Sequence, residues 1–293
     1  MKVNLHTHTR WSDGYLSFQE LVNHAKREGL EYLAITDHDR TKGWSTQNVE
    51  ENSPYISGGI TPFDHGMLST EGLKLIQGVE LSANDNGTEV HILGLFINQP
   101  DREFQIYLDY IEKIRWCRAG RIAERLRIET SDLIKVVGEG LPCRLHFGYI
   151  IFLKKKEEDP SLTCARDAMD RYVSPRTKNY VSFEVDGVYT PQAAIGTILA
   201  YGGIPVWAHP ERTTALPLEE TFRRYSDYAQ GKPIAIEVTD PKRLDEMMNK
   251  FTLVTTGNDF HGYPYEPRDK PLAIEVPAEL MQRLIEAYKA MTR

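Results

Sequence analysis

Near the start of the chain, two histidines and an aspartate have the residue types and spacing to bind a metal ion. His6 and His8 lie in residues 3–8, a run that predicts a short strand. Side chains alternate between the two faces of a strand, so both imidazoles point to the same side. Asp13 follows in the turn signature of residues 12–14, which brings its carboxylate close to them. Taken alone, the pattern also fits two polar residues on a solvated strand face followed by an ordinary turn.

Further histidines and acids occur at or just after predicted strands along the whole chain. Six of the nine histidines and three acids form the candidate set: His6, His8, His38, His91, His209, His261, Asp13, Glu80 and Asp259. A set of imidazoles and carboxylates without thiolates indicates a site for zinc, manganese or iron and is less typical of a closed structural zinc site. Nine candidates exceed what one ion can use. The set therefore indicates two or three ions bridged by a carboxylate, an arrangement that activates water and clamps phosphoryl oxygens.

The elements that must position these residues alternate between strand and helix. Strands are expected at residues 30–36, 73–80, 88–96, 204–208, 234–238 and 251–256, and helices at residues 18–29, 191–201, 217–230, 241–250 and 277–291. Repeated units of this kind favour a parallel barrel or a doubly wound sheet. In a barrel, the carboxyl ends of the strands meet at one mouth. Residues scattered from position 6 to position 261 would then share one cavity.

The middle of the chain lacks this alternation. Residues 101–127 predict one long helix, and residues 128–178 are mostly helical, which indicates a helical insert. The long helix carries Arg115, Arg118 and Arg121 on one face, a pattern that a solvated arginine face would also explain. Before the insert, His65 lies in a loop-like stretch and reads as part of a surface excursion, although such a loop could touch a substrate.

Composition narrows the possible partners. The chain has 293 residues, is 41% apolar and carries a formal charge of −7, so it can build a large core and lacks the basic character of a duplex-DNA binder. This charge does not exclude a small phosphorylated substrate that binds in a local basic pocket. We expect no membrane association and a cytoplasmic location, because no apolar run approaches the roughly 18 residues of a membrane span. The three cysteines share no CxxC spacing and are expected to be reduced structural thiols.

The order and spacing of the motifs resemble one known family. The chain carries His-x-His with Ser12-Asp13-Gly14, Thr36-Asp37-His38-Asp39, Gly78-Val79-Glu80-Leu81-Ser82, Val90-His91-Ile92-Leu93-Gly94, Ala208-His209-Pro210 and Asp259-Phe260-His261-Gly262. Together they look like the motifs of the polymerase and histidinol phosphatase (PHP) family. Asp13, where histidinol phosphatases would have a histidine, makes the chain most similar to nucleoside 3′,5′-bisphosphate phosphatases and short-RNA 5′ exonucleases. Asn258 departs from the pattern, because a serine is expected there.

This resemblance implies a fold and a metal centre. The fold would be a distorted (β/α)7 barrel of the PHP type, formed by residues 1–98 and 190–293, with residues 99–189 as a helical insert over the active-site mouth. The ligand sets implied by the resemblance are His6, His8, Glu80 and Asp259 for the first ion, Glu80, His91 and His209 for the second, and Asp13, His38 and His261 for the third. Asp37 would orient a ligand from behind and, with Glu80 and His209, belong to the catalytic centre. The two to three divalent ions could be Mn²⁺, Fe²⁺, Zn²⁺ or Mg²⁺.

The resemblance also assigns the insert a role in binding substrate. Basic side chains over the mouth would hold the phosphate and the nucleotide, because guanidinium forks pair bidentately with phosphate oxygens. The candidates are Arg115, Arg118, Arg121, Arg144 and His146 from the insert and Arg212 from the loop after His209. The expected partner is a small phosphorylated substrate, a nucleotide by preference, with short RNA as a further option.

The expected reaction is hydrolysis of a phosphomonoester, such as a nucleoside 3′,5′-bisphosphate or 5′-monophosphate, by a metal-activated hydroxide. Alternatives are a histidinol-phosphate or other small-molecule phosphatase, and a 5′ exonuclease on short RNA. A noncatalytic PHP module is disfavoured, because buried imidazoles and carboxylates need a reason to stay together. A metal-dependent amidohydrolase would need a bridging lysine or different histidine pairs, and neither is evident.

Overall fold

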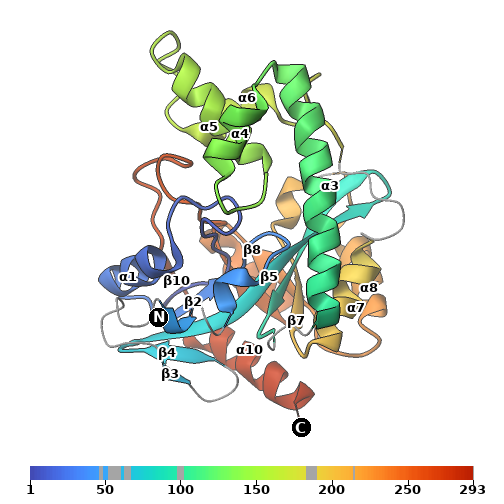
Figure 1. Ribbon diagram of the computed structural model, residues 1–293. Helices are drawn as coiled ribbons and strands as arrows, with labels where there is room; N and C mark the ends of the chain where they lie inside the picture. Colours follow the sequence, from blue (N-terminus) through green and yellow to red (C-terminus); the bar gives the residue numbers. More distant parts are fainter. Residues whose placement is uncertain are drawn as a thin grey trace.

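The structure is built around one ten-stranded sheet that curls toward a barrel (Figure 1). This computed structural model describes residues 1–45, 49–51, 61–62, 67–97, 102–182, 190–213 and 215–292, so His65 lies outside the described residues. The main path of the sheet runs in the order β10 (Ile274–Glu275), β1 (Lys2–Asn4), β2 (Tyr32–Ile35), β5 (Leu73–Asp85), β6 (Thr88–Leu95), β7 (Ile204–Trp207), β8 (Ala235–Val238) and β9 (Val254–Thr256). Two short strands, β3 (Thr61–Pro62) and β4 (Leu68–Thr70), extend it beside β5.

The sheet is not wholly parallel, because β10 pairs antiparallel with β1, and β4 pairs antiparallel with β3 and β5. The strand β6 is the departure that lies inside the main path. β1, β2 and β5 are mutually parallel, as are β7, β8 and β9, but β6 runs antiparallel to both of its neighbours. The cause is the turn Asn86-Gly87, where both residues have a positive φ. An Asn-Gly pair in this conformation makes the tight turn of a β-hairpin, so β5 leads directly into β6 without a crossover helix.

Main-chain hydrogen bonds bring the two ends of the sheet together. The Leu5 N–H donates to the Thr256 carbonyl at 3.0 Å, and the His8 N–H donates to the Phe260 carbonyl at 2.9 Å. Thr7 and Phe260 form a parallel bridge between these segments. The predicted α/β barrel is thereby confirmed as a mixed α/β, nearly closed, barrel-like sheet. The regular strand β1 is shorter than expected, because it ends at Asn4 and only a bridge continues it.

Helices cover the outside of the sheet and bury its apolar face. These are α1 (Phe18–Glu28), α7 (Pro191–Ala200), α8 (Leu218–Tyr228), α9 (Leu244–Lys250) and α10 (Ala278–Met291). The helix α1 shows why these elements begin and end where they do. Ser17 and Glu20 form a capping box at its start, and Gly29 ends it with a φ of 73°. Among the described helices of the chain, none has both the length and the apolar character needed to cross a membrane.

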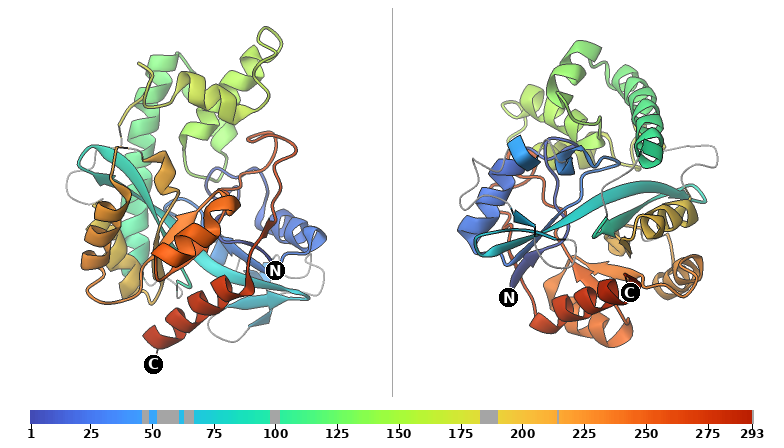
Figure 2. Two further views of the ribbon diagram at one scale, coloured as in Figure 1. Left: turned by 180° about the vertical axis from the view of Figure 1, so that it is seen from behind. Right: turned by 60° about the horizontal axis from the view of Figure 1, so that its bottom comes forward.

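Four further helices gather on one side of the sheet (Figures 1 and 2). They are α3 (Arg102–Leu126), α4 (Thr130–Val137), α5 (Arg144–Lys155) and α6 (Ala165–Tyr172). Buried side chains of α4, α5, α6 and the later part of α3 form a second hydrophobic cluster, whereas Phe104 and Leu108 at the start of α3 belong to the cluster of the barrel. We call these helices the cap. The division into residues 1–98 with 190–293 and residues 99–189 stays a prediction.

The closure of the sheet can be tested at Gly257. A Cβ added there would lie 2.3 Å from the His6 Cβ and 2.7 Å from the His6 nitrogen. We expect Gly257→Ala to lower the free energy of unfolding by about 1–3 kcal/mol, because the backbone must move away from His6. Denaturant titration measures the change.

The matched control is Gly196→Ala on the exposed side of α7. Among the described atoms, a Cβ at this position meets no neighbour within 4 Å. This variant should gain roughly 0.5–1 kcal/mol, because alanine favours a helix over glycine. Equal stability of Gly257→Ala and the unaltered protein would contradict the close approach of His6.

Candidate metal centre

Glu80 lies at the middle of the candidate site, at 0% exposure. Its Oε2 atom is 3.1 Å from the Nε2 atom of His6 and 3.1 Å from the Nε2 atom of His8. Asp259 Oδ1 completes the group, at 3.4 Å from His6 Nε2 and 3.1 Å from His8 Nε2. The two histidines follow β1 and point to the same side, as the alternation predicts.

These atoms face one another without forming hydrogen bonds. Among the described residues, His6 Nε2, His8 Nε2 and Glu80 Oε2 are buried polar atoms with no hydrogen-bond partner. Their separations match the spacing of neighbouring ligands around one ion, because two bonds of about 2.1 Å at a right angle span about 3.0 Å. A cation would satisfy all three atoms, so the residues fit a metal ion.

The other oxygen of Glu80 faces a second pair of histidines. Oε1 lies 2.7 Å from His91 Nδ1 and 3.2 Å from His209 Nε2. His38 Nδ1 approaches Oε2 at 3.0 Å. Since each oxygen of Glu80 faces different imidazoles, the carboxylate is placed to bridge two cations.

Asp13 gathers a third group. Its Oδ1 atom lies 3.3 Å from His261 Nε2, 3.8 Å from His38 Nε2 and 3.8 Å from His8 Nδ1. The His8 and His261 rings stack with centroids 4.3 Å apart. His38 thus faces the Asp13 group with one nitrogen and Glu80 with the other. The structure therefore brings all nine candidate ligands together, and their assignment to individual ions stays a prediction.

A second layer of acids holds the histidines in place. Asp37 accepts hydrogen bonds from the Thr9 N–H at 2.7 Å and the Ser12 hydroxyl at 2.6 Å, and the Ser12 oxygen lies 3.2 Å from His8 Nδ1. Asp37 therefore stands behind His8, in the orienting position that the resemblance implies. Such partners fix the orientation of a ligating imidazole.

Glu237 is a member of this layer that our sequence analysis missed. One oxygen lies 2.9 Å from His6 Nδ1, and the other accepts the backbone N–H of His209 at 2.7 Å. It is 1% exposed and lies in β8. A lone glutamate inside an otherwise apolar strand is the signal that could have found it.

Two candidate ligands also have unusual backbone conformations. His209 has a φ of 29° and Asp259 a φ of 54°. Non-glycine residues in this region cost about 1–3 kcal/mol each and persist where the surroundings impose them. Both residues follow strands, β7 and β9, and the turn directs their side chains toward Glu80.

The pKa values of the buried groups show which of them would carry charge without a metal ion. Burial by itself would lower the pKa of His8, but the carboxylates of Asp259 and Glu80, each 3.1 Å from Nε2, raise it to about 10. Burial also acts to lower the pKa of His91, and the charge of Glu80 raises it to about 9. Burial would raise the pKa of Glu80, but the surrounding histidines, His38 foremost, hold it well below its usual range. Protons on His8 and His91 thus supply positive charge that a cation would otherwise supply, whereas burial lowers the pKa of His38 and of His209.

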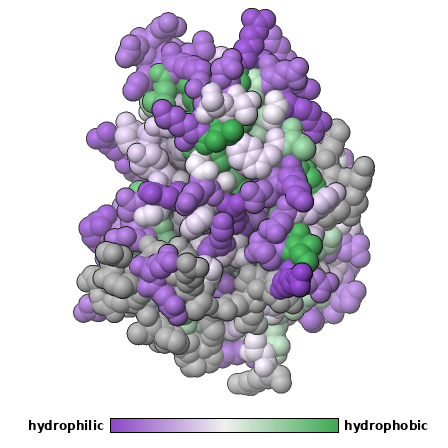
Figure 3. All heavy atoms as spheres, in the orientation of Figure 1, coloured by the Kyte–Doolittle hydropathy of each residue, from purple (hydrophilic) through white to green (hydrophobic). Residues whose placement is uncertain are grey.

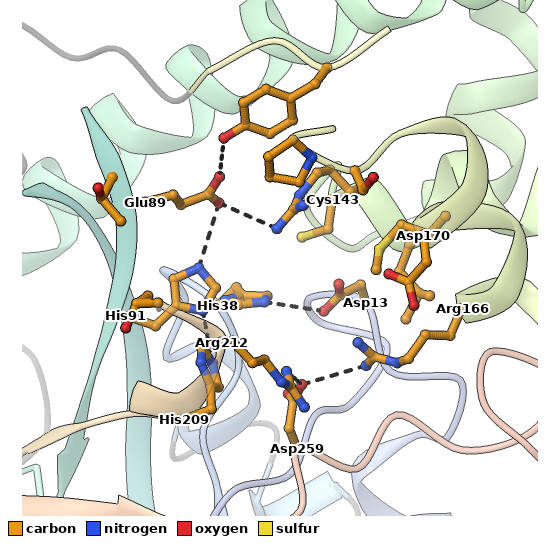
Figure 4. A pocket seen from close by; sticks show the side chains of 18 of the residues that line it. Asp13, His38, Glu89, His91, Cys143, Arg166, Asp170, His209, Arg212 and Asp259 are labelled. Carbon is orange, nitrogen blue, oxygen red and sulfur yellow. Dashed lines mark hydrogen bonds and ion pairs between the residues drawn. The ribbon is translucent and has the colours of Figure 1, made fainter. Parts of the chain in front are cut away.

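Arginines line a cavity next to these residues, and Figure 4 shows two of them, Arg166 and Arg212. The cavity has a volume of about 850 Å³ and reaches Asp13, His38, His91, His209, Asp259 and His261. The arginines in its described lining are Arg115, Arg118, Arg144, Arg166, Arg176 and Arg212. Figure 3 shows hydrophilic side chains gathered across this face, between the cap and the barrel. The cavity can therefore attract an anion next to the predicted metal ligands.

The predicted substrate-binding residues fall into two classes. Arg144 and Arg212 line the cavity with side chains 23% and 43% exposed, although Arg144 also approaches Glu89 at 3.9 Å and Arg212 pairs with Asp259. Arg115 and Arg118 line it too, but they are buried and form ion pairs with carboxylates. His146 is 2% exposed, and its Nδ1 atom accepts the backbone N–H of Cys143. Neither His146 nor Arg121, which is exposed, occurs in the described lining of the cavity, so the structure does not place them with the other candidates.

Arg166 is a basic residue that our sequence analysis did not single out. Its NH2 group lies 3.5 Å from Asp259 Oδ2 and 3.2 Å from His261 Nδ1. Figure 4 shows Arg166 and Arg212 approaching Asp259 from different sides. Arg166 comes from α6, and little in the local sequence distinguishes it from a surface arginine.

The raised pKa values predict that metal binding releases protons. Below about pH 9, His8 and His91 of the metal-free protein hold protons, and a cation binds only the neutral imidazole. Affinity for Mn²⁺ should therefore increase as the pH rises toward these values and decrease as the pH falls. Calorimetric titration at neutral pH, in buffers that differ in ionisation enthalpy, counts the protons. Binding without proton release would show that the imidazoles are already neutral.

Comparisons with known proteins agree with this geometry. Residues 4–186 match the PHP domain family. A 5′-3′ exoribonuclease of Haemophilus influenzae is 30% identical over 216 residues, 72% of this chain and 69% of that protein. A 3′,5′-nucleoside bisphosphate phosphatase of Chromobacterium violaceum is 25% identical over 277 residues, 88% of this chain and 87% of that protein.

Solved structures share the fold. A Bifidobacterium adolescentis protein superposes with a TM-score of 0.75 at 23% identity, over 97% of this chain and 96% of that one. A Chromobacterium violaceum structure described as an amidohydrolase with bound sulfate and no metal has a TM-score of 0.71 at 24% identity, over 98% and 96% of the two chains. The family match, together with buried clusters of histidines and carboxylates that fit several cations, shows that the chain belongs to the PHP domain family of metal-dependent phosphoesterases.

Proposed function

We propose that this phosphoesterase removes a phosphate from a small nucleotide, of the 3′,5′-bisphosphate or 5′-monophosphate type. The observation that carries the proposal is the arginine-lined cavity that opens onto the predicted metal ligands. Its volume of about 850 Å³ falls in the usual range for small-molecule sites. A nucleotide with two phosphates could place one phosphate at the predicted metal ligands and the other at an arginine of the same cavity.

Bound divalent ions would supply a water molecule of lowered pKa and positive charge beside the phosphate. Arg166 and Arg212 lie next to Asp259, so they are the arginines best placed to pair with the oxygens of the phosphate being cleaved. Arg144 lines the same cavity beside Glu89 and Tyr180, with its guanidinium 5.7 Å from the centroid of the Tyr180 ring. We assign to Arg144 the second phosphate of the substrate.

A second candidate function is 5′ exonuclease activity on short RNA. The observation that favours it is the 30% identity with proteins named 5′-3′ exoribonuclease in Haemophilus influenzae and in Salmonella typhimurium. The Salmonella protein matches over 276 residues, 88% of this chain. The two candidates share the attack on phosphorus and differ in the leaving group, which is a small alcohol or the rest of an RNA chain.

The substrate is tested by measuring products from four compounds in the presence of Mn²⁺. These are adenosine 3′,5′-bisphosphate, 5′-AMP, histidinol phosphate and a short RNA with a 5′ phosphate. We expect inorganic phosphate from the bisphosphate at a kcat/KM at least about tenfold above that of the other monoesters, because two phosphates engage both the metals and the arginines. Release of mononucleotides from RNA with inert monoesters would favour the exonuclease. Preference for histidinol phosphate would overturn both nucleotide assignments.

Two histidine variants control for contaminating phosphatases. His8→Ala removes a predicted ligand and should lower both the rate, by at least about 100-fold, and the bound metal. His24→Ala is the matched control, because His24 lies on α1 and pairs with Glu28. It should keep full activity and metal content. Full activity in His8→Ala would contradict the assignment of the reaction to this site.

A further inference from the structure

Two buried arginines of α3 form ion pairs with carboxylates and do not face open solvent. The Arg115 Nε–H donates to Asp39 Oδ2 at 2.8 Å, and the Arg118 NH2 group donates to Glu89 Oε2 at 2.9 Å. The two arginines are 5% and 7% exposed. Three residues apart on a helix, they share one face, which the carboxylates identify as the face toward the barrel.

Both acids lie next to predicted metal ligands in the sequence. Asp39 directly follows His38. Glu89 lies two residues before His91 in the strand β6, so their side chains share a face of the sheet. The helix α3 is therefore connected to two ligand-bearing segments through one carboxylate each.

The geometry around His91 is the more informative of the two. Its Nδ1 atom lies 2.7 Å from Glu80 Oε1, and its Nε2 atom lies 3.6 Å from Glu89 Oε1. The imidazole thus stands between Glu80 at the centre of the site and Glu89, which the cap holds. Figure 4 shows His91 and Glu89 joined by a dashed line. A carboxylate on the far nitrogen of a ligating histidine fixes its tautomer and its orientation.

Glu89 is itself held on several sides. The Tyr180 hydroxyl donates to Oε2 at 3.0 Å, and Arg118 bonds both oxygens through its terminal nitrogens. The remaining Nε–H of Arg118 donates to the Val181 carbonyl at 2.9 Å. All three nitrogens of Arg118 are thus engaged, and a substrate phosphate would have to displace Glu89 to bind this guanidinium bidentately.

We propose that Glu89 is a positioning residue that holds His91 for metal binding, and that Arg118 anchors Glu89 to the cap. The cap and the metal centre then assemble together. This gives Arg118 a different role from the substrate contact that the sequence suggests. The inference concerns the metal centre and is independent of which phosphate ester the enzyme hydrolyses.

The test compares Mn²⁺ binding by Glu89→Gln, Arg118→Lys and the unaltered protein. Titration of the metal-free proteins, with free Mn²⁺ followed by electron paramagnetic resonance, gives the affinity and the number of ions. We expect Glu89→Gln to lose about 10–100-fold in affinity for one ion, while the other ions bind as before. Arg118→Lys should show a smaller loss of the same kind. Arg121→Lys, three residues farther along α3 and exposed, is the matched control and should bind as the unaltered protein does.

Kinetics separate positioning from substrate binding. If the proposal holds, excess Mn²⁺ restores the kcat of Glu89→Gln. Unchanged Mn²⁺ affinity in Glu89→Gln would overturn the proposal, and a lower KM in that variant would then identify Glu89 as a counter-ion that the substrate displaces. An increased KM in Arg118→Lys with normal Mn²⁺ binding would likewise overturn it and assign Arg118 to the substrate.

A milder variant is available in case Glu89→Gln does not fold. Tyr180→Phe removes one hydrogen bond to Glu89 and leaves the aromatic ring in place. If thermal unfolding in a chelator shows that Glu89→Gln does not fold, Tyr180→Phe takes its place. We expect Tyr180→Phe to weaken binding of one ion by a few-fold. Unchanged affinity in this variant would overturn the proposal.

Discussion

The structure depends on the burial of one carboxylate, Glu80, at the centre of five imidazoles. Its oxygens lie between 2.7 and 3.2 Å from nitrogens of His6, His8, His38, His91 and His209. A buried carboxylate costs several kcal/mol unless positive charge compensates it. That charge comes from protons on the imidazoles or from metal ions, and only metal ions leave every imidazole neutral. The dense set of histidines is thus explained by a metal centre and by little else.

The fold places histidines around Glu80 by bringing together chain segments that are distant in sequence. The segment after β1 closes against the segment after β9, which brings His6 and His8 to Asp259. The approach is so close that position 257 admits only glycine without a shift of the backbone. The hairpin of β5 and β6 places Glu80 and His91 on neighbouring strands. The strand β6, which runs antiparallel to both of its neighbours, therefore carries His91 of the predicted metal centre.

The sequence was sufficient to predict the barrel-like fold, the family and the gathering of the nine residues, because histidines and acids recur in or just after strands and their motifs resemble those of one family. It was insufficient where a partner is distant along the chain. An arginine stripe on a helix looks the same whether it faces water, a phosphate or an acid, and the partner of Arg115 is Asp39, 76 residues away. The direction of β6 was predictable in principle, because Asn86-Gly87 is a hairpin signal. Glu237 was also visible as a charge in an apolar strand, but only the structure shows that it holds His6.

The most direct test of this account is the position of bound metal in a crystal of the enzyme grown with Mn²⁺, measured by anomalous scattering. We expect separate peaks in the three groups around Glu80, His91 and Asp13, with Glu80 in contact with more than one of them. A single peak, or ions bound away from Glu80, would contradict the claim that this carboxylate organises a centre of several metals.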